Sequence, residues 1–274
     1  MIYCSRIFIT LQLNGMLDKF EIILAKQLDG NDLLSEAKKH LFKSKNAKRV
    51  RPRFLFACGK LLNIPEPKLF KMACAVELIH TASLLHDDIV DNAMKRRKLP
   101  SVNAKFGNNM ALLAGDQLLA RALLLLADTP QSQKSVKAAA KTLLKMSDAV
   151  ALEENLRNKK PGTNEQLLSI ADGKTGALFA LCGSLAGYTA NDNIAAEKLS
   201  QVGNLLGRIF QINDDIDDLK EDKEDKTQTL PQIFGTKVTI DEIEKSHDKI
   251  LKIIKNNFET NSKFIESLNI LIRK

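Results

Sequence analysis

Apolar residues recur at intervals of three and four along most of the chain. The clearest run lies between positions 112 and 126, where these intervals are set by Leu112, Leu113, Leu118, Leu119, Leu123 and Leu126. Such spacing places apolar side chains on one face of an α-helix, and the strict alternation typical of β-strands is absent. Most segments between glycine and proline breakers are long enough for helices. We therefore predict an all-α fold.

Composition supports this prediction and bears on the domain organisation. The chain has 274 residues, of which 44% are hydrophobic, and no tryptophan, which fits a helical core of leucine, isoleucine and alanine. No linker rich in glycine, serine or proline divides it, so we predict a single domain over residues 1–274. The stretch from Lys245 to Lys274 predicts short C-terminal helices packed on the surface. The apolar start, MIYCSRIFITLQL, is expected to form either a helix or a disordered segment.

Charge, apolar runs and cysteines disfavour several classes of function. The net charge of +8 comes from lysines mixed with acidic residues, which indicates a solvated basic surface and no nucleic-acid site. Because no run of about 18 apolar residues is present, we expect no membrane span. The cysteines lack the paired spacing of a zinc site and the density of a disulfide scaffold. They indicate reduced thiols in a cytoplasmic protein and stand at Cys4, Cys58, Cys74 and Cys182.

Two aspartate clusters are the main candidates for chemistry. They read DDIVD from Asp87 to Asp91 and DDIDD from Asp214 to Asp218, each within an apolar helical stretch. Residues four apart share one face of a helix, so each cluster projects two carboxylates together. Like charges at this spacing are costly beside apolar residues unless a cation compensates them. Hard oxygen ligands suit Mg²⁺, and we predict that the two clusters face each other and bind it.

Basic residues near these clusters point to phosphate as the further partner. Mg²⁺ is usually held by a few carboxylates together with substrate phosphates. Arginine binds phosphate through two parallel hydrogen bonds, whereas lysine supplies a point charge. The candidates are Lys48, Arg49 and Arg51 upstream, Arg96 and Arg97 after the first cluster, and Lys174 beside Thr175. Taken alone, each of these groups would be an ordinary surface patch.

Four motifs, in this order, resemble those of the trans-polyprenyl diphosphate synthases. AKRVRP begins at Ala47, and the stretch from Glu77 to Ala122 contains the first cluster with its arginine pair. GKTGALF begins at Gly173, and GRIFQINDDIDD begins at Gly207. The resemblance covers most of the chain. It implies an isoprenoid synthase fold, in which helices surround a central cavity and the two clusters face each other across its mouth.

The resemblance also implies roles for individual residues. Asp87, Asp91 and Asp214 would bind Mg²⁺, with three ions expected, while Asp88, Asp215 and Asp218 would act behind them or through water. Arg96 and Lys174 would contact an allylic diphosphate. Isopentenyl diphosphate would be bound by Lys48, Arg51, His80 and Arg97. Thr175 and Gln211 would lie near the allylic carbocation that forms when the diphosphate leaves, and no side-chain nucleophile is needed.

The residues one turn before Asp87 bear on the length of the product. They are Ala82 and Ser83, and in the family small residues here let the growing chain pass, whereas bulky aromatics stop it. We therefore predict a medium- or long-chain, octaprenyl-like product of the kind that forms quinone side chains. The alternatives are a short-chain farnesyl or geranylgeranyl diphosphate synthase, or a non-catalytic prenyl-binding or regulatory subunit. A terpene cyclase is disfavoured, since it needs only one diphosphate site.

Three departures from the family pattern accompany the resemblance. Lys45, Asn46 and Ala47 stand where glycines usually precede the upstream basic motif, and Lys98 replaces a glycine after the arginine pair. The segment after Asp218 is shorter than the usual loop with its glycine–lysine pairs, and either Lys223 or Lys226 would have to substitute. The family implies a homodimer, with a different partner subunit as the alternative.

Overall fold

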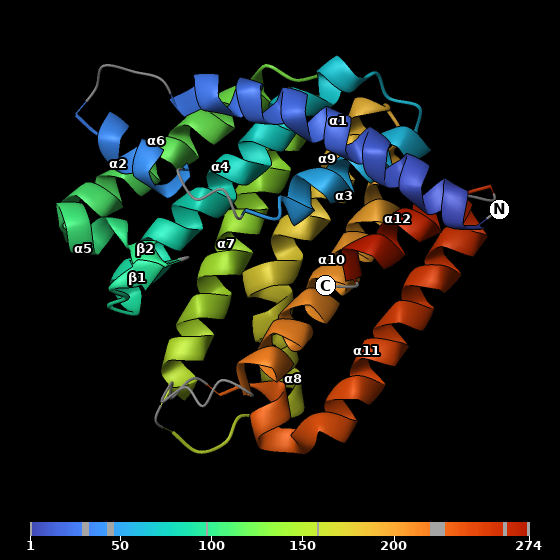
Figure 1. Ribbon diagram of the computed structural model, residues 1–274. Helices are drawn as coiled ribbons and strands as arrows, with labels where there is room; N and C mark the ends of the chain where they lie inside the picture. Colours follow the sequence, from blue (N-terminus) through green and yellow to red (C-terminus); the bar gives the residue numbers. More distant parts are fainter. Residues whose placement is uncertain are drawn as a thin grey trace.

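The computed structural model describes residues 2–28, 33–42, 47–96, 98–157, 159–219, 228–259 and 262–272. Within these ranges the only strands are two short antiparallel ones, in which Arg96 pairs with Leu99. The fold is therefore all-α, as the apolar periodicity predicted (Figure 1). The elements are α1 (Ile2–Leu28), α2 (Ser35–Phe42), α3 (Val50–Leu61), α4 (Glu66–Val90), β1 (Lys95–Arg96), β2 (Leu99–Pro100), α5 (Val102–Phe106), α6 (Asn108–Ala127), α7 (Ser132–Leu156), α8 (Asn164–Ala171), η1 (Asp172–Gly176), α9 (Ala177–Thr189), α10 (Asn193–Leu219), α11 (Leu230–Asn257) and α12 (Ser262–Ile272).

Polar side chains at helix starts explain several of these bounds. The hydroxyl oxygen of Thr163 accepts a hydrogen bond from the backbone N–H of Gln166, and Oε1 of Gln166 accepts one from the backbone N–H of Thr163, so α8 begins with a capping box. The carboxylate of Asp192 accepts a hydrogen bond from the N–H of Ala195 at 2.8 Å and starts α10 in the same manner. These caps satisfy N–H groups that have no partner within the helix.

α9 and α10 pack closely, and this fixes the two helices that carry much of the predicted site. A Cβ atom on Gly183 of α9 would lie 2.2 Å from the backbone oxygen of Leu199, and one on Gly203 of α10 would lie 2.3 Å from that of Phe179. Only glycine allows such an approach. As a result, the segment before α9, which holds Lys174 and Thr175, is held against α10.

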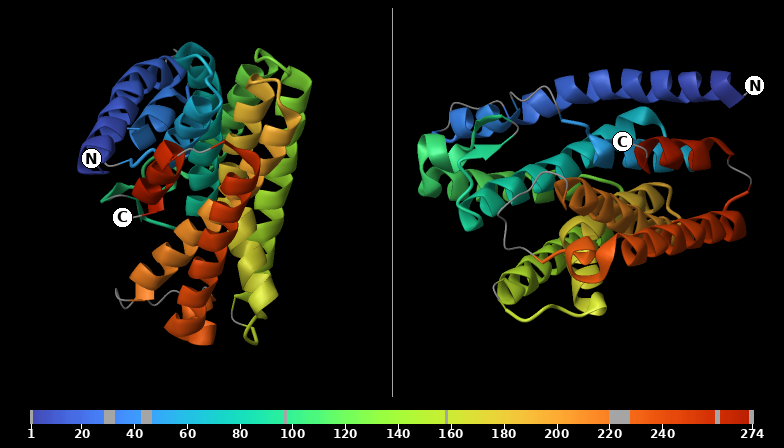
Figure 2. Two further views of the ribbon diagram at one scale, coloured as in Figure 1. Left: turned by 90° about the vertical axis from the view of Figure 1, so that its right-hand side faces the viewer. Right: turned by 60° about the horizontal axis from the view of Figure 1, so that its bottom comes forward.

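The first and last helices, α1 and α12, lie beside each other on one side of the bundle. α1 packs against α3, α4 and α12, and Figure 2 shows it lying along this side. Of the two expectations for the apolar start, the helix is therefore the correct one. α12 packs on α3 and α1, and α11 lies along α10. Two helices follow α10 among the described residues, but α11 begins at Leu230, well before Lys245, and with 28 residues it is not the short helix that the sequence predicted.

The leucine-rich helix α6 has a buried face and an exposed face. Leu118 and Leu126 are buried in the core, whereas Leu112, Leu113 and Leu124 are about half or more exposed. By length and composition alone α6 could cross a membrane, which the sequence analysis did not expect. A core helix passes the same test, and α6 packs extensively on α4. It therefore gives only weak support to a membrane span.

Candidate active site

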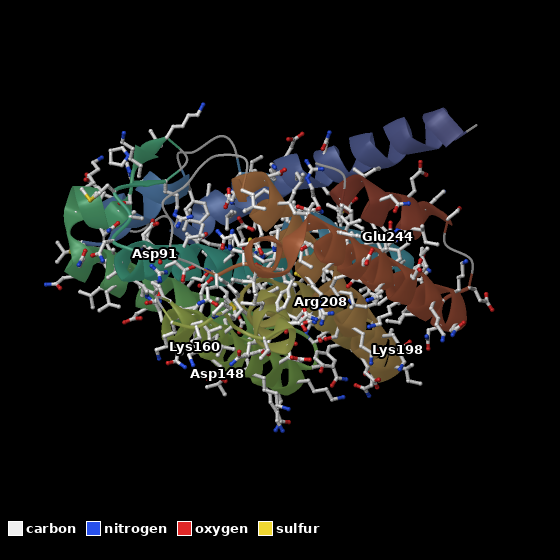
Figure 3. All side chains as sticks on the ribbon, turned by 90° about the horizontal axis from the view of Figure 1, so that it is seen from below. Asp91, Asp148, Lys160, Lys198, Arg208 and Glu244 are labelled. Carbon is white, nitrogen blue, oxygen red and sulfur yellow. The ribbon has the colours of Figure 1, made fainter. Side chains whose placement is uncertain are left out.

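The first aspartate cluster lies where α4 ends, with its members turned in different directions. Asp87 belongs to the last turn, and Asp91 follows as the residue that ends the helix. Asp88 is 1% exposed and faces the strand pair, where its Oδ1 accepts a hydrogen bond from Nε of Arg96 at 2.7 Å. Asp91 accepts one at 2.9 Å from Arg157, the residue that follows α7, and lies at the face seen in Figure 3. Asp88 therefore holds Arg96, while Asp87 lies within electrostatic range of Lys174 and Asp91.

The second cluster lies on the last turns of α10 and continues a chain of polar contacts. The hydroxyl of Thr175 donates to Oε1 of Gln211 at 2.6 Å, and Nε2 of Gln211 donates to Asp215 at 2.8 Å. Asp214 is half-buried and Asp218 is exposed near the end of the helix. The structure thus brings Thr175, Gln211 and Asp215 into direct contact, three residues that the sequence placed in one site.

A short π-helix, η1, presents Lys174 and Thr175. Such segments are uncommon and often occur at functional sites. A Cβ atom on Gly173 would lie 2.4 Å from that of Ala149, so this glycine allows η1 to approach α7. Asp172, at the start of η1, pairs with Arg208 of α10 at 2.6 Å, and Arg208 also pairs with Glu242 of α11 at 2.7 Å. Arg208 thereby anchors η1 to two helices.

Lys174 forms an ion pair with Glu153 of α7, in which Nζ and Oε2 are 2.5 Å apart. Burial disfavours the charged form of Lys174, but Glu153, Asp87 and Asp91 together outweigh this effect and raise the lysine pKa. Burial raises the pKa of Asp87, and it raises that of Asp215 to about 6. Lys174 lowers both aspartate pKa values and Glu153 raises both. The pair is therefore close to Asp87 on α4 and to Asp215 on α10, one residue from each cluster.

The sequence analysis did not predict Glu153. A signal for it does exist, because Glu153 continues the buried face of α7 formed by Met146 and Ala149 at intervals of three and four. An acidic residue on an otherwise apolar face is costly unless it is paired. Arg208 and Arg157 were not predicted either, since they pair with residues on distant segments of the chain.

A cavity of about 280 Å³ opens between α3, α4, η1 and α10. Its lining brings together five residues of the predicted site, namely Lys48, Arg51, His80, Thr175 and Asp214. The guanidinium of Arg51 lies over the ring of Phe179, 5.3 Å from its centroid. Arg49 also lines this cavity, but it pairs with the buried Glu77 and, at 2.6 Å, with Glu21. Arg49 therefore joins α1 to α4 through ion pairs, which distinguishes it from Lys48 and Arg51 as a structural residue.

The remaining predicted residues are placed as follows. Ala82 is fully buried, and half-buried Ser83 donates from its hydroxyl to the backbone oxygen of His80 at 2.9 Å. Lys98, at the position of the missing glycine, has a φ of 70° and so keeps the left-handed conformation that glycine favours. Some predictions concern positions outside the described residues, namely Arg97, Lys223, Lys226, Lys45 and Asn46.

The donor set fits a hard divalent cation, although the carboxylates are not gathered around one point. Among the described residues, no three aspartate, glutamate, histidine or cysteine side chains are close enough to enclose a metal ion. The available ligands are carboxylate oxygens, which Mg²⁺ prefers. Oδ2 of Asp88 is buried without a hydrogen-bond partner, and Asp87 lies within electrostatic range of Asp91, which raises its pKa. A bound cation would compensate this concentration of negative charge.

A helical bundle that presents two aspartate clusters beside a basic cavity has the architecture of an all-α prenyltransferase. The family model for polyprenyl synthetase matches residues 31–271. The chain belongs to the polyprenyl synthetase family and is a prenyltransferase, as its four motifs predicted.

Relatives of known name agree with this assignment. The chain is 35% identical over 208 residues to geranylfarnesyl diphosphate synthase of Methanosarcina mazei, and the aligned region covers 73% of this chain and 70% of the relative. It is 32% identical over 256 residues to geranylgeranyl diphosphate synthase of Saccharolobus solfataricus, covering 88% and 76%. It is 36% identical over 203 residues to nonaprenyl diphosphate synthase of Mycobacterium tuberculosis, covering 73% and 59%. These names refer to products of different length.

Solved structures support the fold. A geranyltranstransferase from Thermotoga maritima superposes with a TM-score of 0.83 at 29% identity, covering 95% of this chain and 96% of that one. A polyprenyl synthase from Caulobacter crescentus, solved with calcium and isoprenyl diphosphate, gives a TM-score of 0.86 at 23% identity, covering 96% and 95%. The likeness extends over almost the whole described chain.

Proposed function

We propose that the protein condenses isopentenyl diphosphate head-to-tail with an allylic diphosphate, in a Mg²⁺-dependent reaction, to make a medium- or long-chain all-trans polyprenyl diphosphate. The observation that carries the proposal is the cavity lined by Lys48, Arg51 and His80, which reaches Asp214 of the second cluster. Two diphosphates are then bound side by side, one at the aspartates and one in the cavity. A protein that bound a single diphosphate would not need both.

The allylic diphosphate is assigned to the space between the clusters. Asp87, Asp91 and Asp214 would hold up to three Mg²⁺ ions directly, and Asp215 and Asp218 would do so through water. When bound, Mg²⁺ neutralises the negative charge that grows on the departing diphosphate. Lys174 is close to both clusters and adds a positive charge beside the same group.

Arg96 supports the same diphosphate from the strand pair. Asp88 fixes its guanidinium through contacts of 2.6 and 2.7 Å, so Asp88 acts mainly by positioning Arg96. Arg96 remains 29% exposed in its side chain, which leaves part of the guanidinium available for an anion. The fixed geometry lowers the entropy that the arginine loses when it binds.

Isopentenyl diphosphate is assigned to the basic cavity, where Lys48, Arg51 and His80 supply its charge partners, together with Arg97. Stacking on Phe179 holds the guanidinium of Arg51 in place. The allylic carbon–oxygen bond breaks first, and its electron pair leaves with the diphosphate. The double bond of isopentenyl diphosphate then attacks the resulting allylic carbocation, a carbon–carbon bond forms, and one proton is lost to the departed diphosphate.

Thr175 and Gln211 serve the carbocation without reacting with it. The Thr175 hydroxyl donates its hydrogen to Gln211, so the lone pairs of its oxygen face outward. Those lone pairs offer a partial negative charge to the allylic cation, and Asp215 fixes the Gln211 amide in turn. This arrangement stabilises positive charge and offers no strong nucleophile that would capture it.

The small side chains of Ala82 and Ser83 support a product longer than those of the short-chain synthases. A farnesyl or geranylgeranyl diphosphate synthase remains the alternative, as does a prenyl-binding or regulatory subunit without turnover. The exposed leucines of α6, with Leu144 of α7, support a homodimer through these helices, with a different subunit as the alternative partner. We assign the protein to the cytoplasm.

The test is to incubate purified protein with Mg²⁺, farnesyl diphosphate and labelled isopentenyl diphosphate and to resolve the dephosphorylated products by length. We expect a ladder that ends well above about twenty carbons, since each condensation adds one five-carbon unit. Asp87→Asn should abolish it, whereas Asp148→Asn, at an exposed position of α7, should not. Shorter products alone would support the short-chain alternative, and absence of product would support the non-catalytic one.

A further inference from the structure

A second cavity, of about 760 Å³, lies over α9 between α7 on one side and α10 with α11 on the other. Among the described residues that line it there is no aspartate and no residue assigned above to either diphosphate. Its floor includes the buried side chains of Ala177 and Leu181 of α9. We call this feature the lysine groove, and it is separate from the proposed active site.

Six lysines surround the lysine groove. Two of them have neutral partners on or next to α10, because Lys134 donates to Asn193 at 2.9 Å and Lys145 donates to Asn204 at 3.1 Å. Within the described part of the chain, none of the six forms an ion pair with a carboxylate. An apolar floor with uncompensated positive charge along its rim is suited to an anionic, partly apolar ligand. The six are Lys134, Lys137, Lys141, Lys145, Lys249 and Lys252.

The arrangement of the lysines defines the shape of that ligand. The four on α7 are separated by three or four residues, which gives one positive charge per helical turn over roughly 16 Å. A single phosphate group would need one compact cluster, and arginine would suit it better. No arginine lines the described part of the groove. The ligand is therefore elongated and carries negative charge at regular intervals along one edge.

The floor is suited to a helix. Ala177, Ala180 and Ser184 follow one another along α9 at helical spacing, and their small side chains allow another helix to approach closely. Such a helix would have apolar residues on one face and acidic residues at one edge. It would bury its apolar face against α9 and pair its acidic residues with the lysines of α7.

We propose that the lysine groove binds an acidic amphipathic helix from a different polypeptide. A second copy of this chain is a poor occupant, because its net charge of +8 would oppose docking at a basic groove. The partner is expected to carry about one carboxylate per turn along three turns. Its binding does not depend on the proposed reaction.

The test uses a fluorescein-labelled synthetic peptide of about six helical turns, with leucines on one face and one glutamate per turn at its edge. A peptide of the same composition in scrambled order is the comparison. Fluorescence anisotropy with the full-length protein measures both affinities. We expect the ordered peptide to bind at least about tenfold more tightly, a difference of about 1.4 kcal/mol.

Variants separate a specific groove from diffuse attraction. The double variant Lys137→Glu/Lys141→Glu should weaken the ordered peptide about tenfold or more. Lys255→Glu/Lys263→Glu changes the net charge equally at exposed positions outside the groove and should change affinity less than about twofold. Ala180→Phe fills the floor without changing charge and should also weaken binding. Circular dichroism verifies that each variant is folded.

Three results would overturn the proposal. One is equal affinity for the ordered and scrambled peptides. Another is an equal loss in the two double variants, which would indicate attraction to the whole basic surface. The third result comes from binding to vesicles that contain anionic phospholipid. If Lys137→Glu/Lys141→Glu abolishes vesicle binding but leaves peptide binding unchanged, the groove is a membrane contact.

Discussion

Lys174 and Glu153 form an ion pair that lies close to both aspartate clusters, and each affects the pKa of Asp87 and of Asp215. The carboxylate of Glu153 pairs directly with the ammonium group of Lys174. An allylic diphosphate at this place would compete with Glu153 for the same ammonium group. Glu153 therefore holds the side chain of Lys174 in position. It also determines how readily the ammonium group of Lys174 can pair with a diphosphate.

The first prediction concerns this pair. Glu153→Gln removes the charge that raises the Lys174 pKa, so the lysine loses both its fixed position and part of its preference for the protonated form. We expect kcat/KM for the allylic substrate to fall about tenfold, or about 1.4 kcal/mol. Steady-state kinetics at several concentrations of farnesyl diphosphate measure it.

A double-mutant cycle shows whether Glu153 acts through Lys174. In a Lys174→Ala background, Glu153→Gln should have almost no further effect. Glu197→Gln, at an exposed position of α10, serves as the control and should leave kcat/KM unchanged. Additive losses in the double variant would show that Glu153 acts independently of the lysine.

The second prediction concerns Asp88 and Arg96. Asp88→Asn leaves a buried amide in place of the carboxylate and removes the ion pair that fixes Arg96. We expect a loss of about 1–3 kcal/mol in the free energy of unfolding, below the usual cost at fully buried pairs because Arg96 reaches solvent. Urea unfolding measures the loss. Asp128→Asn removes an exposed pair with Lys71 and should cost less than about 0.5 kcal/mol.

The same variant should also raise KM for the allylic diphosphate more than KM for isopentenyl diphosphate, because Arg96 is assigned to the former. Equal changes in both constants would indicate a general loss of structure and would argue against positioning of Arg96 by Asp88.

The sequence predicted those parts of the site that follow from local spacing. Asp87 and Asp91 were expected at one turn of a helix, and the cavity gathers Lys48, Arg51 and His80, which the motifs grouped. Local spacing does not determine which distant side chains meet. The sequence therefore did not predict that Asp88 pairs with Arg96, because this contact depends on the strand pair folding back onto α4.

The contacts that the sequence did not reveal are ion pairs between helices. Arg208 joins η1 to α11, and Arg49 joins α1 to α4. Both residues looked like members of a basic surface, since charge alone does not distinguish a paired arginine from a free one. The all-α fold was predictable because the apolar periodicity persists over most of the chain.

The third prediction concerns the buried thiols of Cys58, Cys74 and Cys182. Burial raises all three pKa values, that of Cys74 to about 12, so these thiols stay protonated in the folded protein at pH 8. A disulfide reagent such as DTNB reacts with thiolates and should modify none of them in the native state. In urea, all four cysteines should react. Rapid native modification of Cys58, Cys74 or Cys182, identified by mass spectrometry, would contradict this.

The same pKa shifts give a pH dependence of stability. In the unfolded chain the thiols ionise near pH 8.5, whereas in the folded protein they do so at higher pH. The unfolded state therefore binds fewer protons above about pH 8.5, and the free energy of unfolding falls as pH rises. Each buried thiol should contribute about 1 kcal/mol of loss per pH unit in this range. Cys74→Ala should reduce the slope measured by urea unfolding between about pH 8.5 and pH 10.

The last prediction concerns product length. Ala82 is fully buried on α4, about one turn before Asp87, and a growing prenyl chain that leaves the clusters between the helices would pass it. Ala82→Phe adds a ring at this point, so we expect shorter products. Overpacking costs about 1–3 kcal/mol of stability, and Ser83→Phe, at a half-buried position, is the variant to use if Ala82→Phe does not fold. Asn256→Phe, at an exposed position of α11, should leave the product distribution unchanged. An unchanged distribution in folded, active Ala82→Phe would show that this residue does not line the path of the chain.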